Sequence, residues 1–293
     1  MRNAFAEETI ELFGKNENLA LILGDIGVYG FREVLEKYPS RAMNIGILEQ
    51  SMIGVGAGMS SEGMIPIIHT IAPFLVERAL EQIKIDFGYQ GLPGNLVSVG
   101  ASFDYSSLGC THHCPGDVNI LSNIPGLNIF IPGHEKEFRN SFKANWNNKS
   151  LNYFRLSEKA NLENFDLELG ETQKLAAGNA ACLVVIGPLL DEVRVAISGL
   201  DIELHYTNTL SNSLSLRLQS QFPGNKLIIV EPFYSGSIRQ HLDSTIESTA
   251  LRILQIGIPK VFIRRYGSHD DLMHFVGLDA KSIRVKIEKF IGQ

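Results

Sequence analysis

The sequence is poor in the features that mark several special classes of protein. It has only three cysteines in 293 residues, which excludes a disulfide-built scaffold and is typical of a reducing compartment. No apolar run reaches the roughly 18 residues of a membrane span, and the N-terminal segment carries acids where a signal peptide needs an apolar core. The 27 glycines and 11 prolines are too few for a disordered or repetitive chain. We therefore expect a cytoplasmic protein with no membrane association.

Positive charge is also scarce. Lysine and arginine number 26 against 32 aspartates and glutamates, a net charge of −6, and there is no basic arm, so nucleic-acid binding is not expected. With 44% hydrophobic and 20% charged residues, the chain has the composition of an ordinary globular protein of one large or two medium domains. This leaves an enzyme or an interaction subunit as the main classes.

Helical and strand-like segments alternate along the chain. Phe5, Leu12 and Phe13 fall on one face of an N-terminal helix. Short apolar runs predict strands at residues 19–25, 42–47, 65–69, 95–99, 127–131, 153–156, 181–186, 202–206, 226–230 and 252–256. Helices are predicted at residues 31–38, 50–62, 74–88, 190–198, 237–247 and 280–291. The predicted fold class is therefore α/β, with two doubly wound α/β domains whose sheets are mainly parallel.

A charged stretch without sustained periodicity divides this pattern in two. We interpret residues 159–175 as a linker between a first domain of residues 1–158 and a second domain of residues 176–293. Both lengths lie within the usual range for a single domain.

The most informative stretch surrounds Glu49. This carboxylate lies just beyond a predicted strand, where open parallel sheets bind ligands, and at the head of a helix that contains Gly54, Gly56 and Gly58. Glycines lower helix propensity, so we expect another backbone to approach them closely. An acid that only complements the helix dipole would look the same. The spacing lacks the third glycine of G-x-G-x-x-G, so no dinucleotide fingerprint is present.

Several motifs, in order along the chain, resemble transketolase. In the first domain they are residues 44–52 (NIGILEQSM), 66–74 (PIIHTIAPF), 78–83 (RALEQI), 109–113 (GCTHH), 124–127 (IPGL) and 131–132 (IP). In the second domain they are Val230-Glu231 with Gly236, residues 257–259 (GIP), Gly267-Ser268, Leu272 and residues 277–280 (GLDA). The resemblance spans essentially the whole chain. It implies a pyrimidine-binding domain, the shared module of thiamine-diphosphate enzymes, followed by a transketolase C-terminal domain.

The resemblance also implies roles for individual residues. Glu49 matches the glutamate that hydrogen-bonds the aminopyrimidine of thiamine diphosphate and promotes proton loss from the thiazolium carbon; such a carboxylate needs a dry pocket. His112 matches an active-site histidine able to donate a hydrogen bond or shuttle a proton. Phe74 matches the aromatic that packs on the pyrimidine, and Ile71 stands where many relatives have another aromatic. The expected catalytic residues are Glu49 and His112, and the expected cofactor-binding residues are Glu49, Phe74, Ile71, Arg78 and Asp25.

Other interpretations of these residue types stay open. Phe74 fits a plain core position, and Arg78 fits a surface charge on its helix. His69 and His113 are near in sequence, but each is more often a satisfied loop histidine than a catalyst. Cys110-Thr-His-His-Cys114 offers four metal-ligand types, yet one short loop rarely wraps all four around an ion, so we expect no metal there.

Departures from the family pattern concern the substrate. Sugar-phosphate transketolases carry a histidine, an aspartate and an arginine where this chain has Gly100, Leu108 and Glu158. An arginine binds phosphate bidentately, whereas a carboxylate repels it. We therefore predict a substrate other than the usual phosphorylated acceptor, such as an unphosphorylated sugar, a nucleotide-linked sugar or a small 2-oxo acid. Residues 27–30 (GVYG) hint at a relative of 2-oxo acid dehydrogenases or deoxyxylulose phosphate synthase.

A further absence concerns the cofactor's metal. Transketolases bind Mg²⁺ and diphosphate with a Gly-Asp-Gly motif and a downstream asparagine. Here Gly24-Asp25 is followed by Ile26, and Gly116-Asp117 by Val118. By analogy with split transketolases, we expect a second, alpha polypeptide to carry that motif and the Mg²⁺ in an α₂β₂ assembly, with the beta chains also self-associating. The expected reaction is transfer of a two-carbon ketol unit, and a non-catalytic partner subunit is the alternative.

Overall fold

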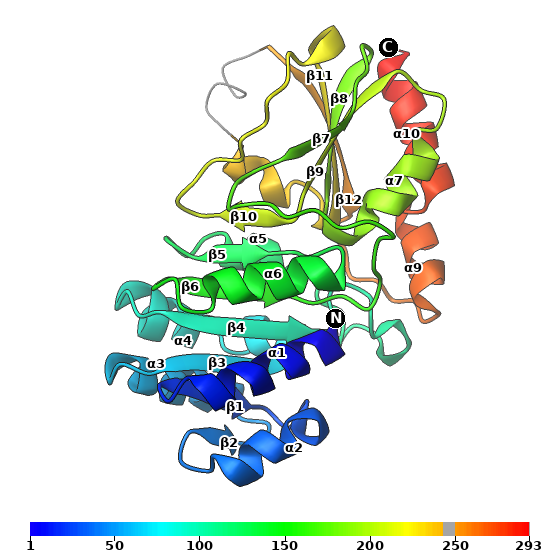
Figure 1. Ribbon diagram of the computed structural model, residues 1–293. Helices are drawn as coiled ribbons and strands as arrows, with labels where there is room; N and C mark the ends of the chain where they lie inside the picture. The colour runs from blue at the N-terminus through cyan, green and yellow to red at the C-terminus, as the bar shows by residue number, and fades with distance from the viewer. Residues whose placement is uncertain (243–249, 293) are drawn as a thin grey trace.

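The computed structural model describes residues 1–242 and 250–292 and has two mainly parallel β-sheets (Figure 1). The first sheet has seven strands in the order β10-β5-β6-β4-β3-β1-β2. Their bounds are β1 (Leu19–Leu23), β2 (Ala42–Asn44), β3 (Ile65–Ile71), β4 (Gly94–Val99), β5 (Asn128–Phe130), β6 (Leu151–Arg155) and β10 (Thr209–Ser211). The predicted α/β fold class is confirmed.

Helices cover both faces of this first sheet because its strands carry apolar side chains on both faces. One face packs against α1 (Arg2–Lys15), α2 (Val28–Lys37) and α6 (Glu135–Asn145), and α1 and α6 cross in front of the sheet in Figure 1. The other face packs against α3 (Glu49–Ser61), α4 (Leu80–Gln82) and α5 (Asp117–Leu121). The helix predicted at 74–88 is instead a short α4 between two π-helical turns, Pro73–Glu77 and Ile83–Tyr89.

The second sheet has five strands in the order β12-β11-β8-β9-β7. Their bounds are β7 (Gln173–Ala176), β8 (Ala181–Ile186), β9 (Ile202–Thr207), β11 (Lys226–Tyr234) and β12 (Arg252–Ile258). Three helices cover one face: α7 (Leu190–Ala196), α9 (His269–Val276) and α10 (Ala280–Ile291). The opposite face packs against residues 216–222 and the 3₁₀ turn Ser237–His241, within a core shared with the first sheet. Of the helix predicted at 237–247, the part beyond 242 lies outside the described residues.

One strand physically joins the two halves of the chain. β10 follows the second-sheet strand β9 directly, yet it pairs antiparallel with β5 of the first sheet. In Figure 1 it forms the edge of the first sheet that lies nearest the second sheet. The division into residues 1–158, 159–175 and 176–293 stays a prediction.

The glycines of α3 differ in what surrounds them. A Cβ on Gly56 would lie 2.5 Å from Ile68 Cδ1, so this glycine lets α3 sit close on β3. The expected approach of another backbone at Gly56 is wrong within the described chain, because side chains of the sheet fill that place. Gly54 and Gly58 face outward, and a Cβ on Gly58 would meet none of the described atoms within 4 Å.

No helix among the described residues is long and apolar enough to cross a membrane.

Candidate active site

Glu49 is the first residue of α3 and is almost completely buried, with 1% of its surface exposed. Its Oε2 accepts a hydrogen bond of 2.8 Å from Arg78 Nη1, so a guanidinium balances the buried negative charge. Its Oε1 is also buried but has no hydrogen-bond partner among the described residues. A buried carboxylate oxygen without a donor is costly, which favours a ligand that supplies one.

The Phe74 ring links Arg78 to His112, the predicted catalytic histidine. Arg78 Cζ lies 4.2 Å from the centroid of the Phe74 ring, a distance typical of a cation–π contact. The Phe74 and His112 rings meet edge-on with their centroids 5.2 Å apart. His112 Nδ1 lies 2.9 Å from Thr111 Oγ1, and the centroid of the Tyr105 ring lies 6.4 Å from that of the imidazole. The structure therefore brings Glu49, Arg78, Phe74 and His112 into one connected group.

Ile71 joins this group through Gly100. Gly100 has a φ of +79°, and a Cβ there would lie 2.5 Å from the Tyr105 ring and 3.0 Å from Ile71 Cγ2. Only glycine accepts both this backbone conformation and this close contact. The departure at Gly100 thus has a structural reason: Tyr105 occupies the space that a larger side chain would take.

Asp25 lies at the end of β1 and is held by a different neighbour. Its backbone N–H donates to Asn44 Oδ1 at 2.9 Å, and Asn44 Nδ2 donates to Asp25 Oδ1 at 3.2 Å. Asp25 is exposed and has a φ of +64°, a strained conformation for a residue other than glycine. No described hydrogen bond or ion pair joins it to the Glu49 group, so its cofactor role stays a prediction.

The family assignment follows from comparison with known proteins. Residues 1–162 match the family model described as "Transketolase, pyrimidine binding domain". The chain belongs to the transketolase family. The family resemblance of the sequence motifs is therefore confirmed.

Two relatives of this transketolase-family chain and one solved structure match it along nearly all of its length. It is 34% identical over 277 residues to the "Uncharacterized 33.6 kDa protein in fasciation locus" of Rhodococcoides fascians, covering 93% of this chain and 88% of the relative. It is 24% identical over 298 residues to a subunit of apulose-4-phosphate transketolase of Phocaeicola vulgatus, covering 96% and 94%. A solved structure described as "Split gene transketolase, inactive beta4 tetramer" has a TM-score of 0.80 at 20% identity, covering 99% and 97%, which shows a shared fold.

The two other candidate histidines of this transketolase-family chain, His69 and His113, are packed in the core. His69 is fully buried beside Phe5, and its Nδ1 lies 2.8 Å from the Val97 carbonyl oxygen. Burial lowers the pKa of His69 to about 4. His113 is buried edge-on against Phe103, and burial lowers its pKa as well. Neither ring is in contact with the Glu49 group through any described hydrogen bond.

A hollow of about 280 Å³ opens beside Gly100 and Tyr105, at the carboxyl ends of β4 and β6. Three carboxyl groups, those of Glu135, Glu158 and Asp104, line it, and Arg2 is the one lysine or arginine side chain among its lining residues. Two of the departures from the family pattern, Gly100 and Glu158, therefore face the same space. The excess of carboxylates makes this hollow a poor phosphate site.

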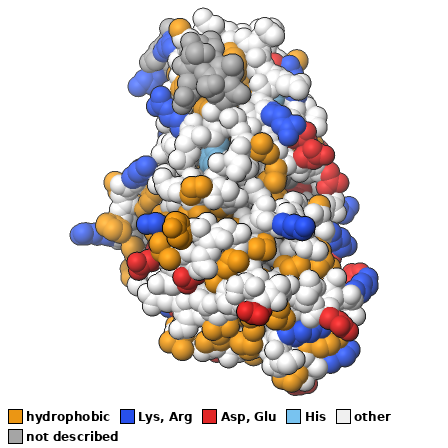
Figure 2. All heavy atoms as spheres, turned by 90° about the vertical axis from the view of Figure 1, so that its left-hand side faces the viewer, with side chains coloured by type: hydrophobic (Ala, Val, Ile, Leu, Met, Phe, Trp, Pro, Cys, Tyr) orange, Lys and Arg blue, Asp and Glu red, His pale blue; other side chains and the backbone are white. Residues whose placement is uncertain are grey.

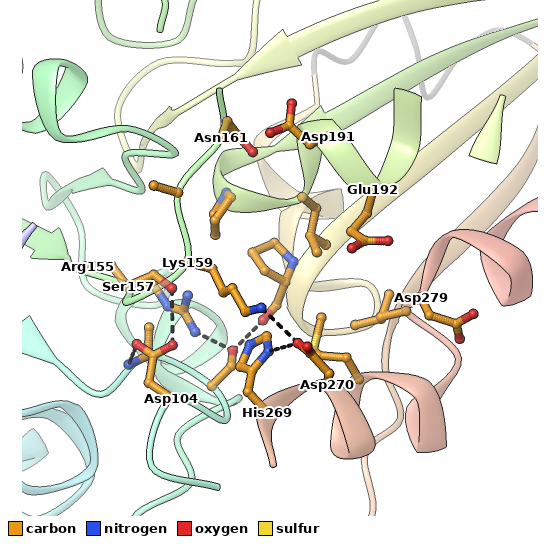
Figure 3. A pocket seen from close by; sticks show the side chains of 18 residues that line it. Asp104, Arg155, Ser157, Lys159, Asn161, Asp191, Glu192, His269, Asp270 and Asp279 are labelled. Atoms are coloured by element: carbon orange, nitrogen blue, oxygen red, sulfur yellow. Dashed lines mark hydrogen bonds and ion pairs between the residues drawn. The ribbon is translucent and has the colours of Figure 1, made fainter. Parts of the chain in front are cut away.

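A second cavity, of about 290 Å³, lies between the two sheets (Figure 3). Lys159 and His269 both point toward Asp270, at 2.8 Å and 3.3 Å from its Oδ1. Asp104, from the loop that also carries Tyr105 and His112, accepts hydrogen bonds from the Ser157 hydroxyl and from backbone N–H groups. Burial raises the pKa of Asp104 to about 7.

Five polar residues near the site escaped the sequence interpretation. Arg155 Nε donates to Asp117 Oδ2 at 2.7 Å, and Tyr153 donates to the same oxygen at 2.8 Å, all within the core. Tyr105 and Asp104 follow the end of β4 in an irregular loop, where no periodicity marks their direction. Arg155 is buried and ends β6, and a charged residue at the end of an apolar strand is the one sequence feature that could have pointed to this group.

The two cysteines of the Cys110–Cys114 loop lie in different surroundings. Cys110 is exposed, whereas Cys114 is buried and points toward Glu77, at 3.8 Å from Oε1. Within the described residues, three or more metal-ligand atoms gather only at Cys182, Glu203 and His205.

Proposed function

We propose that this chain is the C-terminal, or beta, subunit of a thiamine-diphosphate-dependent transketolase-like enzyme that transfers a two-carbon ketol unit. Support comes from a relative named as one subunit of a transketolase, of which this chain covers 94%, and from the likeness in fold to a beta-chain assembly of a split-gene transketolase. The chain also lacks the Gly-Asp-Gly motif. In the proposal, an alpha chain supplies the diphosphate and Mg²⁺ ligands.

The unpartnered Oε1 of Glu49 is the observation that carries this proposal. Glu49 is buried and fixed by Arg78, and its Oε1 would accept a hydrogen bond from the ring N–H that the cofactor's pyrimidine carries in its imino tautomer. When bound, thiamine diphosphate supplies the carbon nucleophile that the transfer of a ketol unit requires. Phe74 would pack its ring on the pyrimidine, Ile71 would contact it from the end of β3, and Asp25 is proposed at the rim of the site.

His112 is proposed to act on the substrate. Its ring meets those of Phe74 and Tyr105 edge-on, and Nδ1 is oriented by the Thr111 hydroxyl. This arrangement leaves Nε2 to donate a hydrogen bond, or to transfer a proton, to an oxygen atom of a bound sugar.

The proposed substrate has no phosphate group that the chain binds in the manner usual for sugar-phosphate transketolases. Glu158 and Glu135 line the hollow next to Gly100, where a phosphate would meet more negative than positive charge. An unphosphorylated or nucleotide-linked sugar, or a small 2-oxo acid, avoids this repulsion. The relative named for apulose 4-phosphate makes a sugar-phosphate assay an essential comparison.

The proposed partner would cover the outer surface of α3 and its neighbours. Exposed apolar side chains there include Ile47, Leu48, Val55, Ile85 and Tyr89. Hydrophobic side chains lie scattered among few charges over the lower half of the face in Figure 2, where α3 and α4 lie. Apolar surface of this kind marks protein interfaces. An α₂β₂ assembly that also pairs the beta chains would bury it and close the site of Glu49.

The test is reconstitution with an alpha chain that carries Gly-Asp-Gly and the downstream asparagine. We expect ketol transfer with thiamine diphosphate and Mg²⁺, abolished by Glu49→Gln while the complex still assembles. Glu36→Gln, an exposed acid of α2, is the matched control and should stay active. Undiminished activity of Glu49→Gln would contradict the assigned role.

The same complex separates the remaining alternatives. Efficient turnover of xylulose 5-phosphate with ribose 5-phosphate would overturn the proposed substrate class. Release of CO₂ from pyruvate would identify a 2-oxo acid enzyme instead. An assembled complex that is inactive toward every donor would favour the non-catalytic subunit.

A further inference from the structure

The second sheet buries a polar cluster that has no part in the site described above. Cys182 on β8 and Glu203 on β9 are direct neighbours in the parallel register, and His205 follows two residues later on the same face of β9. Cys182 is completely buried, His205 is 1% exposed and Glu203 is 5% exposed. One potential ligand atom from each of the three residues lies within 4.8 Å of the other two.

The contacts of this cluster leave part of its hydrogen-bonding capacity unused. Glu203 Oε1 lies 3.0 Å from His205 Nε2 and accepts a hydrogen bond from the Ser220 hydroxyl. Glu203 Oε2 accepts from Lys174 Nζ. His205 Nδ1 is buried and has no partner in the described part of the chain. Buried polar atoms are normally satisfied, so an orphaned ring nitrogen beside a thiol and a carboxylate calls for a physical explanation.

We propose that Cys182, Glu203 and His205 bind one divalent zinc ion. Thiolate, imidazole and carboxylate are the ligand types that zinc takes in proteins, with bonds of about 2.0–2.3 Å. Ligand atoms already within 4.8 Å of one another need only small side-chain shifts to reach a common ion. The fourth position of a tetrahedron falls to the Ser220 hydroxyl or to water.

Charge and protons balance at this site. As the sulfur–zinc bond forms, the Cys182 thiol loses its proton to solvent, and the resulting thiolate together with the Glu203 carboxylate offsets the two positive charges of the ion. His205 binds as the neutral imidazole through one ring nitrogen and keeps its proton on the other. Nothing is oxidised or reduced.

An ion can reach the cluster from solvent. Glu203 lines an open surface hollow together with Lys174, Asp201 and Gln221. The Lys174 side chain is 47% exposed, so it can turn toward water when an ion replaces it at the carboxylate. Bound zinc would tie β8 to β9 and, through Ser220, to the segment that covers this face of the second sheet. Its role would be structural.

The test uses the full chain, freed of metal and titrated with Co²⁺ as a spectroscopic probe for the zinc site. We expect one Co²⁺ per chain, a thiolate-to-cobalt charge-transfer band in the near ultraviolet and its loss when Zn²⁺ is added. Cys182→Ser should lose the band. His205→Ala should weaken binding by more than the ~10–100-fold that follows loss of a residue hydrogen-bonded to a metal ligand.

Two cysteine variants serve as matched controls. Cys110→Ser and Cys114→Ser should keep both the band and the stoichiometry, because these residues lie in the loop of the first domain, outside the cluster. Zn²⁺ should also raise the melting temperature of the wild-type chain but not that of His205→Ala, which keeps the inference testable if Cys182→Ser folds poorly. Absence of stoichiometric binding in the wild type, or a band that survives in Cys182→Ser, would overturn it.

Discussion

At the scale of single residues, Arg155 and Asp117 form a fully buried ion pair that should be sensitive to substitution. Arg155 and Asp117 are 1% and 0% exposed, and their ion pair is surrounded by hydrogen bonds from Tyr153 and to Ser102. A buried ion pair contributes little net stability compared with apolar residues, yet removal of one partner leaves the other charge buried and alone. This asymmetry makes each residue sensitive to substitution on its own.

We expect Arg155→Met to lower the free energy of unfolding by about 3–5 kcal/mol, because Asp117 is left without its cation. Urea denaturation followed by circular dichroism measures this loss. Arg194→Met, which breaks the exposed pair with Glu163, is the control and should cost no more than about 1 kcal/mol. Equal losses of free energy in the two variants would contradict the expected cost of leaving the buried Asp117 carboxylate without its cation.

Asp104 should make the stability of the fold depend on pH, and the direction of this dependence follows from its pKa. Burial raises that pKa from 3.8 to about 7, so between these values the folded chain holds a proton that the unfolded chain has released. This carboxyl therefore lowers the stability of the fold as pH rises through that window, by at most about 1.4 kcal/mol per pH unit.

Asp104→Asn removes this titration while keeping an oxygen for the N–H groups of Ala101 and Glu158. We expect the free energy of unfolding of the variant, relative to wild type, to increase steadily from pH 4.5 to pH 7. Urea unfolding at a series of pH values measures it. Parallel curves for the two proteins would contradict the raised pKa.

At the scale of elements, the sequence pattern and the structure agree where burial is complete. All ten strands predicted from apolar runs are present, with boundaries that shift by a few residues, because strands of parallel sheets are apolar on both faces. β7 escaped because three of its four residues are exposed and its first two are polar, and β10 because only one of its three residues, Leu210, is apolar. α6 escaped although Phe138 and Phe142 lie on its buried face, since charged and polar residues together make up most of its sequence.

The residues of the candidate site likewise include some that the sequence predicted and one that it did not. Glu49, Phe74, Arg78 and His112 were reached through family motifs, and the structure brings these four side chains together. Tyr105 was not reached, because its position depends on the left-handed turn at Gly100 and on the course of the loop that follows. Such contacts arise from tertiary structure and leave no periodic signal in the sequence.

The glycines of α3 give a prediction at this scale. Gly56→Ala should destabilise the chain, because the new Cβ lies 2.5 Å from Ile68 in a packed core and overpacking costs about 1–3 kcal/mol. Gly58→Ala should stabilise the isolated chain by up to about 1 kcal/mol through helix propensity, because its Cβ meets open space. Thermal and urea unfolding of both variants would measure the contrast, and a stabilising effect of Gly56→Ala would contradict the packing described for α3.

At the scale of the whole molecule, the chain is proposed to hold half of an active site. The pyrimidine side has a buried acceptor in Glu49, whereas Gly-Asp-Gly is absent from the sequence. The affinity for thiamine diphosphate should therefore be much higher in the complex with the alpha chain than in the isolated chain.

We expect thiamine diphosphate to bind weakly to the isolated chain and tightly to the complex with an alpha chain in the presence of Mg²⁺. Isothermal titration calorimetry of the two samples measures the difference. Tight binding by the isolated chain, with turnover of substrate unaided, would contradict the proposed division of the site.

The position of β10 also bears on how the chain is made. Its partner β5 and the neighbouring β6 leave the ribosome well before β10, which is translated only after β8 and β9. At about 5–20 residues per second, the nascent first sheet keeps an open edge for on the order of several seconds. Open edges are templates for pairing with other chains. The brevity of β5, three residues, limits what can pair there while the strand that closes the sheet is still being synthesised.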